Sequence, residues 1–176
     1  MKVIRSWPAE IPDGRCYVVD TLPRLVMTGY DYRCLAYVDD DVVLIEWDMA
    51  VHREELQTFI DRAVSAPGDV LVAPYRIYES TIKSVPLNHP VWPLRRYTDD
   101  GTRMRWVEEG EPFCHLFAFG LTYLPRSIVA AYLKAQPDEH FNDVSFSGWH
   151  HRNVRAETPI AWDVRPVHLH YAIDRM

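Results

Sequence analysis

The chain has 176 residues, of which 48% are hydrophobic and 25% charged, so it can bury the core of one globular domain. Its net charge of −6 argues against a basic face of the kind that nucleic acids require. No stretch approaches the roughly 20 apolar residues that span a bilayer, and the three cysteines show no paired spacing. We therefore expect a soluble, cytoplasmic protein with reduced cysteines, and nucleic-acid binding is not expected.

Three short strands are predicted in the first 48 residues, at 16–19, 34–38 and 42–45. The third is wholly apolar, which is typical of a strand covered on both faces of a parallel sheet. Glu46 and Asp48 follow it directly. Ligands of such sheets bind beyond the carboxyl ends of the strands, where carboxylates are costly to desolvate without a cation or a partner. The pattern predicts a divalent-metal site, with the alternative that one carboxylate caps the next helix and the other is solvated.

The clearest helix follows, because apolar residues recur on one face at Leu56, Phe59, Ile60, Ala63 and Val64. Pro67 and Gly68 end it, and residues 70–73 form the next buried strand. A strand, a helix and a strand in this order make a parallel crossover unit. We therefore predict a single-domain α/β fold with a mainly parallel central sheet flanked by helices.

Residues 84–112 are rich in proline and charge and predict an irregular insertion or flap within the single domain 1–176. Asp100-Gly101 predicts a hairpin turn inside it. Arginines of this flap, Arg95 among them, either reach a phosphate group or pair with Asp99, Glu108 and Glu109.

An apolar strand at 113–119 ends at Gly120, and Pro125 opens a further helix. Gly120 marks either a close approach of the backbone to a ligand or a simple turn. Residues 160–171 alternate as a strand would, and place His168 and His170 on one face. Two such imidazoles can reach one cation, and we favour His168 slightly because it lies nearer the inner part of the strand.

The order of these motifs resembles that of GT-A-fold glycosyltransferases. The acid-x-acid motif before "MAVHREEL" is similar to their metal-binding stretch, and "CHLFAFGLTYLPRSIVAAYL" to their donor and acceptor region. "FNDVSFSGWHHR" resembles the acidic motif of inverting members, and "RPVHLHY" the place of a late metal-binding histidine. The resemblance runs from about residue 42 to residue 171, with a shortened nucleotide-binding half.

The resemblance implies a hexosyltransferase-like enzyme, bacterial or phage-encoded, that uses Mn²⁺ or Mg²⁺, a nucleotide-sugar donor and an unknown acceptor. Asp143 becomes the candidate catalytic base, with a helix N-cap as the alternative. Asp20 and Trp149 become candidates for donor recognition, although a buried tryptophan is more often part of a core. Two other functions stay open, a metal-dependent phosphoesterase or hydrolase and a non-catalytic carbohydrate- or nucleotide-binding module. The oligomeric state stays unknown.

Overall fold

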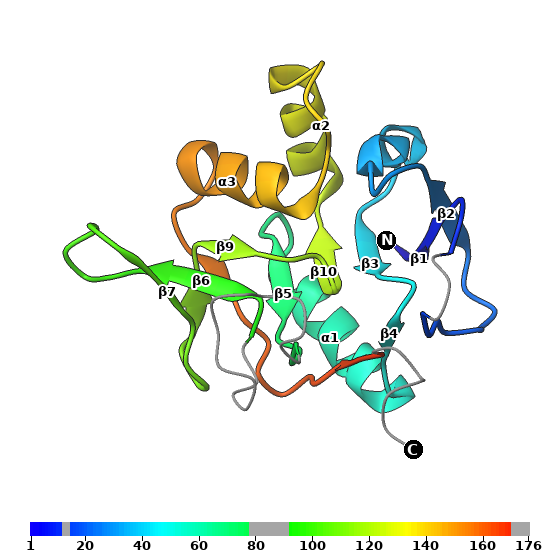
Figure 1. The fold of residues 1–176 in the computed structure, drawn as a ribbon, viewed down its shortest axis with the longest axis horizontal. Helices are drawn as coiled ribbons and strands as arrows, with labels where there is room; N and C mark the ends of the chain where they lie inside the picture. Colours follow the sequence, from blue (N-terminus) through cyan, green and yellow to red (C-terminus); the bar gives the residue numbers. More distant parts are fainter. Residues whose placement is uncertain (12–14, 78–91, 170–176) are drawn as a thin grey trace.

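A five-stranded sheet lies at the centre of the computed structural model, which describes residues 1–11, 15–77 and 92–169 (Figure 1). The strand order is β2-β1-β3-β10-β5. The bounds are Lys2–Pro8 for β1, Arg24–Met27 for β2, Val42–Ile45 for β3, Leu71–Ala73 for β5 and Leu121–Leu124 for β10. Strand β1 is parallel to both of its neighbours, whereas β10 runs antiparallel to β3 and β5. The protein is thus a single α/β domain with a mixed sheet, and a mainly parallel sheet is not confirmed.

Strand β10 makes the central sheet mixed instead of mainly parallel, because it runs antiparallel to both of its neighbours. It follows Gly120 directly, at the point where the sequence predicted that the preceding strand ends, and no strand was predicted between Gly120 and the helix at Pro125. Strands β3 and β5 still point the same way, as the strand–helix–strand unit predicts, and helix α1 (Arg53–Ser65) connects them. They are not neighbours, because β10 lies between them. The strand–helix–strand pattern was predicted correctly from the local sequence, but a strand from a distant part of the chain lies between its two strands.

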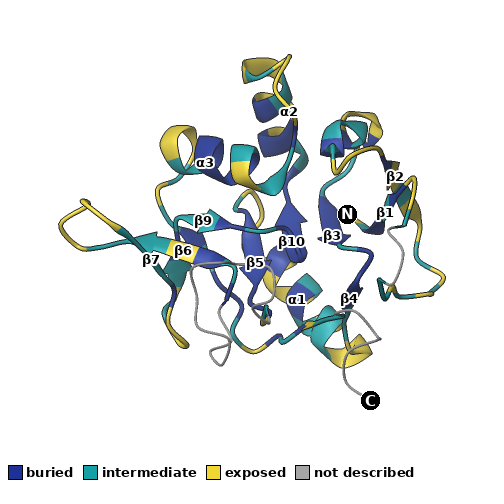
Figure 2. Ribbon diagram, in the orientation of Figure 1, coloured by how far each residue is buried: buried dark blue, intermediate teal, exposed yellow. Residues whose placement is uncertain are grey.

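Helices cover both faces of the sheet, and alternate residues of β3 point to opposite faces. Val43 and Ile45 belong to the cluster that contains Phe59 of α1. Val42 and Leu44 belong to the larger cluster on the other face. That cluster is completed by helices α2 (Arg126–Ala135) and α3 (Asp143–Asn153) and by the 3₁₀ helix η1 (Tyr32–Tyr37). Figure 2 shows the central strands as the most deeply buried part of the chain.

Two of the early strand predictions are wrong. Residues 34–37 fall in η1 and Val38 is its C-cap, while Asp31 caps the other end by accepting a hydrogen bond from the Arg33 N–H at 3.0 Å. Residues 16–19 form no strand, although the Val18 N–H donates to the Trp47 carbonyl. Both segments are short, so local apolar content alone does not decide their structure.

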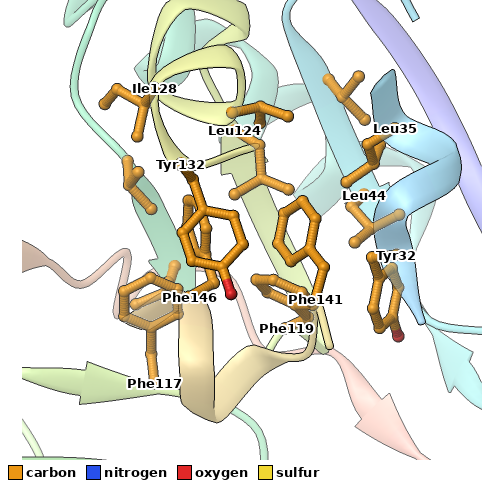
Figure 3. Packing of buried hydrophobic residues seen from close by; sticks show 14 of the residues in the cluster. Tyr32, Leu35, Leu44, Phe117, Phe119, Leu124, Ile128, Tyr132, Phe141 and Phe146 are labelled. Atoms are coloured by element: carbon orange, nitrogen blue, oxygen red, sulfur yellow. The ribbon is translucent and has the colours of Figure 1, made fainter. Parts of the chain in front are cut away.

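Aromatic rings fill the larger cluster between the sheet and α2 and α3 (Figure 3). Phe146 is fully buried and stacks on Phe141 with ring centroids 5.3 Å apart. Tyr132 lies at a similar distance from Phe146, and Trp149 packs against both Tyr132 and Phe146. This packing fixes the position of α3, whose first residue is Asp143.

The remaining strands form three small sheets. Their bounds are Met49–Ala50 for β4, Leu94–Tyr97 for β6, Met104–Trp106 for β7, Phe113–Cys114 for β8, Leu116–Phe117 for β9, Thr158–Pro159 for β11 and Val167–His168 for β12. Strands β6 and β7 form the predicted hairpin, and β9 pairs with the other side of β6. The single strand predicted at 113–119 is divided into β8 and β9, and that at 160–171 is reduced to β12 within the described residues. No helix in the described ranges has the length and apolar character needed to cross a membrane.

Candidate active site

The acidic turn after β3 is held by a buried arginine that the sequence reading did not single out. Arg5 of β1 is 2% exposed, and its Nη1 donates to the carbonyl oxygens of Glu46 at 2.7 Å and Met49 at 2.9 Å. The Glu46 N–H donates to the Gly120 carbonyl at 2.8 Å. The two ends of the turn are thereby tied to β1 and to the start of β10. The available signal was weak: Arg5 lies beside Val3, Ile4 and Trp7 in a short segment that also contains Lys2 and Ser6.

Asp20, the predicted donor-binding residue, is the ion-pair partner of this arginine. Its Oδ2 accepts from Arg5 Nε at 2.8 Å and from Nη2 at 2.6 Å, and its Oδ1 accepts from the Leu22 N–H at 3.1 Å. These contacts neutralise the buried guanidinium. The structure therefore gives Asp20 a part in supporting the acidic turn.

Asp48 and His168 are brought together by a two-stranded ladder. Strands β4 and β12 pair antiparallel, so that His168 lies opposite Met49, and the Leu169 N–H donates to the Asp48 carbonyl at 2.8 Å. His168 Nε2 lies 3.1 Å from Asp48 Oδ2, and Arg15 Nη2 lies 3.9 Å from the same oxygen. Asp48 is 4% exposed. Two residues 120 positions apart in the sequence thus share one partly buried contact.

The other oxygen of Asp48 is one of three buried side-chain polar atoms without a hydrogen-bond partner in the described ranges. Oδ1 is buried and accepts no hydrogen bond within the described part of the chain. An unpaired buried carboxylate oxygen costs a few kcal/mol, on the order of its lost solvation. A hard divalent cation takes oxygen ligands of this kind, and imidazole nitrogen is added in sites for Mn²⁺. The carboxylate oxygen of Asp48 and the imidazole of His168 are therefore ligand types that suit the predicted Mn²⁺ or Mg²⁺.

The described residues contain no group of three or more His, Cys, Asp or Glu side chains arranged to hold a metal ion. The pair of Asp48 and His168 would leave other coordination positions to substrate or water. His170, the second histidine of the prediction, lies outside the described residues. The preference for His168 over His170 therefore stays a prediction.

A pocket of about 300 Å³ opens over this pair. Its wall contains four of the predicted site residues together with an arginine, two tyrosines, a tryptophan and an asparagine. The lining residues are Arg15, Tyr30, Tyr32, Glu46, Trp47, Asp48, Asn142, Asp143 and His168. The candidate metal ligands and the candidate base therefore meet in one cavity, although they come from three separate parts of the chain.

The carboxyl groups in this pocket repel one another and are partly removed from water. Burial raises the pKa of Glu46 from 4.5 to about 8, and the charges of Asp48 and Asp143 add to the rise. A hydrogen bond from the Tyr32 hydroxyl to Glu46 Oε1 at 2.8 Å opposes it. Burial also raises the pKa of Asp143. At neutral pH Glu46 is therefore mostly protonated, and a cation bound beside it would displace that proton.

Asp143 is the first residue of α3 and is not its cap. Asn142 is the cap, and its side chain accepts from the Ser145 N–H at 2.8 Å. Asp143 accepts only a local hydrogen bond, from the Val144 N–H at 2.8 Å. The alternative that Asp143 is the helix N-cap is therefore wrong, because Asn142 occupies that position. Neither carboxylate of the turn caps α1, because the cap position of that helix is His52.

The other predicted binding residues lie elsewhere. Gly120 has a φ of +29°, and a Cβ there would clash with the Tyr75 ring, so the close approach at this glycine is to the Tyr75 side chain. Trp149 is 6% exposed in the aromatic cluster and does not line the pocket. Arg95 lies on β6 and lines an adjoining cavity with Asp143.

No protein-family profile and no curated protein matches this chain. Among solved structures, it is similar to the one described as the crystal structure of A197 from STIV. The TM-score is 0.60 with 12% identical residues, and the match covers 96% of this chain and 85% of that one. At this level of identity the likeness is one of fold alone.

Proposed function

We propose that the protein is a metal-dependent glycosyltransferase of the GT-A type, which transfers a sugar from a nucleotide-diphosphate sugar to an acceptor hydroxyl. The observation that carries the proposal is the shared pocket, in which the pair of Asp48 and His168 meets Asp143. Such a transfer needs a group that binds a diphosphate-bound cation and a separate base for the acceptor. The likeness to the solved structure supports the α/β fold only.

In this proposal Asp48 and His168 hold Mn²⁺ or Mg²⁺, through the unpaired Oδ1 and the imidazole Nε2. When bound, the ion would neutralise the charge that develops on the leaving diphosphate. Arg5 is a positioning residue that does not contact the ion, since it holds the backbone on either side of Asp48. Tyr32 orients Glu46 through their hydrogen bond.

Asp143 accepts the proton of the acceptor hydroxyl as that oxygen attacks the anomeric carbon. Burial raises the pKa of Asp143 above the usual value of an aspartate, which makes the ionised carboxylate a stronger base. Its place at the start of α3 is rigid, because the aromatic cluster holds the following turns of the helix. The carboxylate is therefore presented at one position of the pocket.

In the proposal the donor binds beside His168. A second cavity of about 260 Å³ shares His168 with the first and is lined by Arg76, Trp92 and Arg165. The Arg76 and Arg165 guanidinium carbons lie 5.2 and 5.4 Å from the Trp92 ring centroid. Arg165 donates from Nη2 to Glu109 Oε1 at 2.9 Å and from Nε to the Trp162 carbonyl at 2.7 Å. In the proposal the diphosphate therefore binds mainly to the Arg76 guanidinium, which can donate two parallel hydrogen bonds to phosphate oxygens, and to the remaining N–H groups of Arg165. This replaces Asp20 and Trp149 as donor-recognition residues in the proposal.

The proposal is tested by calorimetric titration with a panel of uridine, guanosine and thymidine diphosphate sugars, with and without Mn²⁺. We expect metal-dependent binding of at least one donor, and at least a ~100-fold loss in Asp48→Asn, as for removal of a principal electrostatic contact. Asp61→Asn on the exposed side of α1 is the matched control and should bind as wild type. Metal-independent binding, or no binding by any donor, would overturn the proposal.

The base is tested separately by turnover. Asp143→Asn preserves shape and removes the proton acceptor, so turnover should fall by about 100-fold or more while donor affinity stays unchanged. A wild-type rate in this variant would remove Asp143 from that role. If the protein instead releases phosphate from simple phosphoesters in the presence of metal, the hydrolase interpretation replaces the transferase.

A further inference from the structure

A third cavity adjoins the active-site pocket on the side of Asp143. Its volume is about 320 Å³, within the size range of small-molecule sites. Its wall is mostly apolar and comes from β6, β7, β9 and the start of α3. The lining residues are Ile77, Pro93, Arg95, Trp106, Leu116, Phe117, Ala118, Asp143, Val144 and Ser147. Figure 1 shows α3 beside β9 and the β6–β7 hairpin extending away from the central sheet.

Arg95 and Trp106 both line this cavity. They are opposite each other in the β6–β7 register, and the Arg95 guanidinium lies 4.3 Å from the Trp106 ring centroid. Arg95 is exposed and Trp106 half-buried. Stacking on an aromatic ring holds a guanidinium in place and leaves its N–H edge available for an anion.

Arg95 differs from its neighbours in how its charge is balanced. Arg96 and Arg105, on the same hairpin, both pair with Glu111, at 3.4 and 2.8 Å. Arg95 pairs with no carboxylate among residues 1–11, 15–77 and 92–169. The sequence predicted Asp99, Glu108 and Glu109 as partners of the flap arginines, but the main partner is Glu111. Of the predicted three, only Glu108 contacts a flap arginine among the described residues, at 4.0 Å from Arg105. Arg95 is a stacked cation without a carboxylate partner in the described part of the chain, and it lines a mostly apolar cavity.

We propose that this cavity binds a ligand that carries a flat apolar group and an anionic group. The flat group packs on Leu116, Phe117 and Trp106, and the anion accepts hydrogen bonds from Arg95. Because Asp143 lines both this cavity and the active-site pocket, a hydroxyl on the same ligand lies next to the base. This ligand would then be the acceptor of the transfer. That assignment rests on the proposed transferase function, whereas the prediction that the cavity binds such a ligand is independent of it.

The test uses 4-hydroxybenzoate and its neutral counterpart 4-hydroxybenzamide, titrated by ligand-observed NMR in the absence of donor and metal. We expect wild type to bind the acid about tenfold more tightly than the amide, as for a charge-assisted hydrogen bond. Arg95→Gln should abolish this preference. Arg103→Gln removes the same charge from the same hairpin outside the cavity and should retain it.

Trp106→Leu tests the apolar contact, and it should weaken both probes by a similar factor. Circular dichroism and thermal unfolding establish that each variant is folded. The proposal is overturned if neither probe binds to wild type, or if the preference for the acid survives in Arg95→Gln. Either outcome can be told apart from failure of the transferase proposal, which is decided by the donor titration.

Discussion

The titration of Glu46 provides a quantitative test of how far the carboxyl groups of the active-site pocket are removed from water. The unfolded chain releases this proton near pH 4.5, whereas the folded protein releases it near pH 8. Between these values the folded state binds more protons, so the contribution of Glu46 to stability is complete below pH 4.5 and is lost as the pH rises to about 8. A difference of this size corresponds to at most about 5 kcal/mol. Because part of the side chain is exposed, we expect about 2–4 kcal/mol after solvent screening.

Glu46→Gln removes this titration but keeps an oxygen that accepts from the Tyr32 hydroxyl. The variant should equal wild type in free energy of unfolding at pH 4.5 and exceed it by about 2–4 kcal/mol at pH 8.5. The measurement is urea unfolding at a series of pH values. Glu54→Gln, an exposed residue in the first turn of α1, is the matched control and should show no such divergence. A difference between Glu46→Gln and wild type that does not change with pH would refute the desolvation of this carboxyl.

Four further substitutions test the framework of the site by equilibrium unfolding. Phe146→Ala leaves a cavity between fully buried rings and should cost about 3–5 kcal/mol. Arg5→Met leaves two backbone carbonyls and a carboxylate without their donor, and should cost about 3 kcal/mol. Gly120→Ala forces a Cβ against the Tyr75 ring at positive φ, for a loss of about 1–3 kcal/mol. Asn142→Ala removes the cap of α3 and should cost about 1 kcal/mol.

Each of these has an outcome that would contradict it. A loss below 1 kcal/mol in Phe146→Ala would mean that the aromatic cluster is loosely packed. An Arg5→Met variant as stable as wild type, with normal metal binding, would remove Arg5 from the support of the acidic turn. Gly120→Ala with unchanged thermal stability would contradict the close contact with Tyr75, and Asn142→Ala with unchanged stability would contradict the cap.

The sequence alone was sufficient for the elements whose signals are local. The apolar face of α1, the wholly buried β3 and the hairpin turn at Asp100 and Gly101 each follow from spacing within a dozen residues. The acidic pair was also recognised, because carboxylates directly after a buried strand conflict with burial. These features need no knowledge of what packs against them.

The tertiary structure decided everything that depends on distant partners. Insertion of β10 between β3 and β5 makes the sheet mixed, and no local pattern reports which strands become neighbours. Asp20, which the sequence suggested for donor recognition, forms a partly exposed ion pair with the buried Arg5, and only the contact between them shows this. Asp48, Asp143 and His168 form one pocket because the β4–β12 ladder and the packing of α3 place them there. The residue types indicated the chemistry, and long-range packing determined which of them share a cavity.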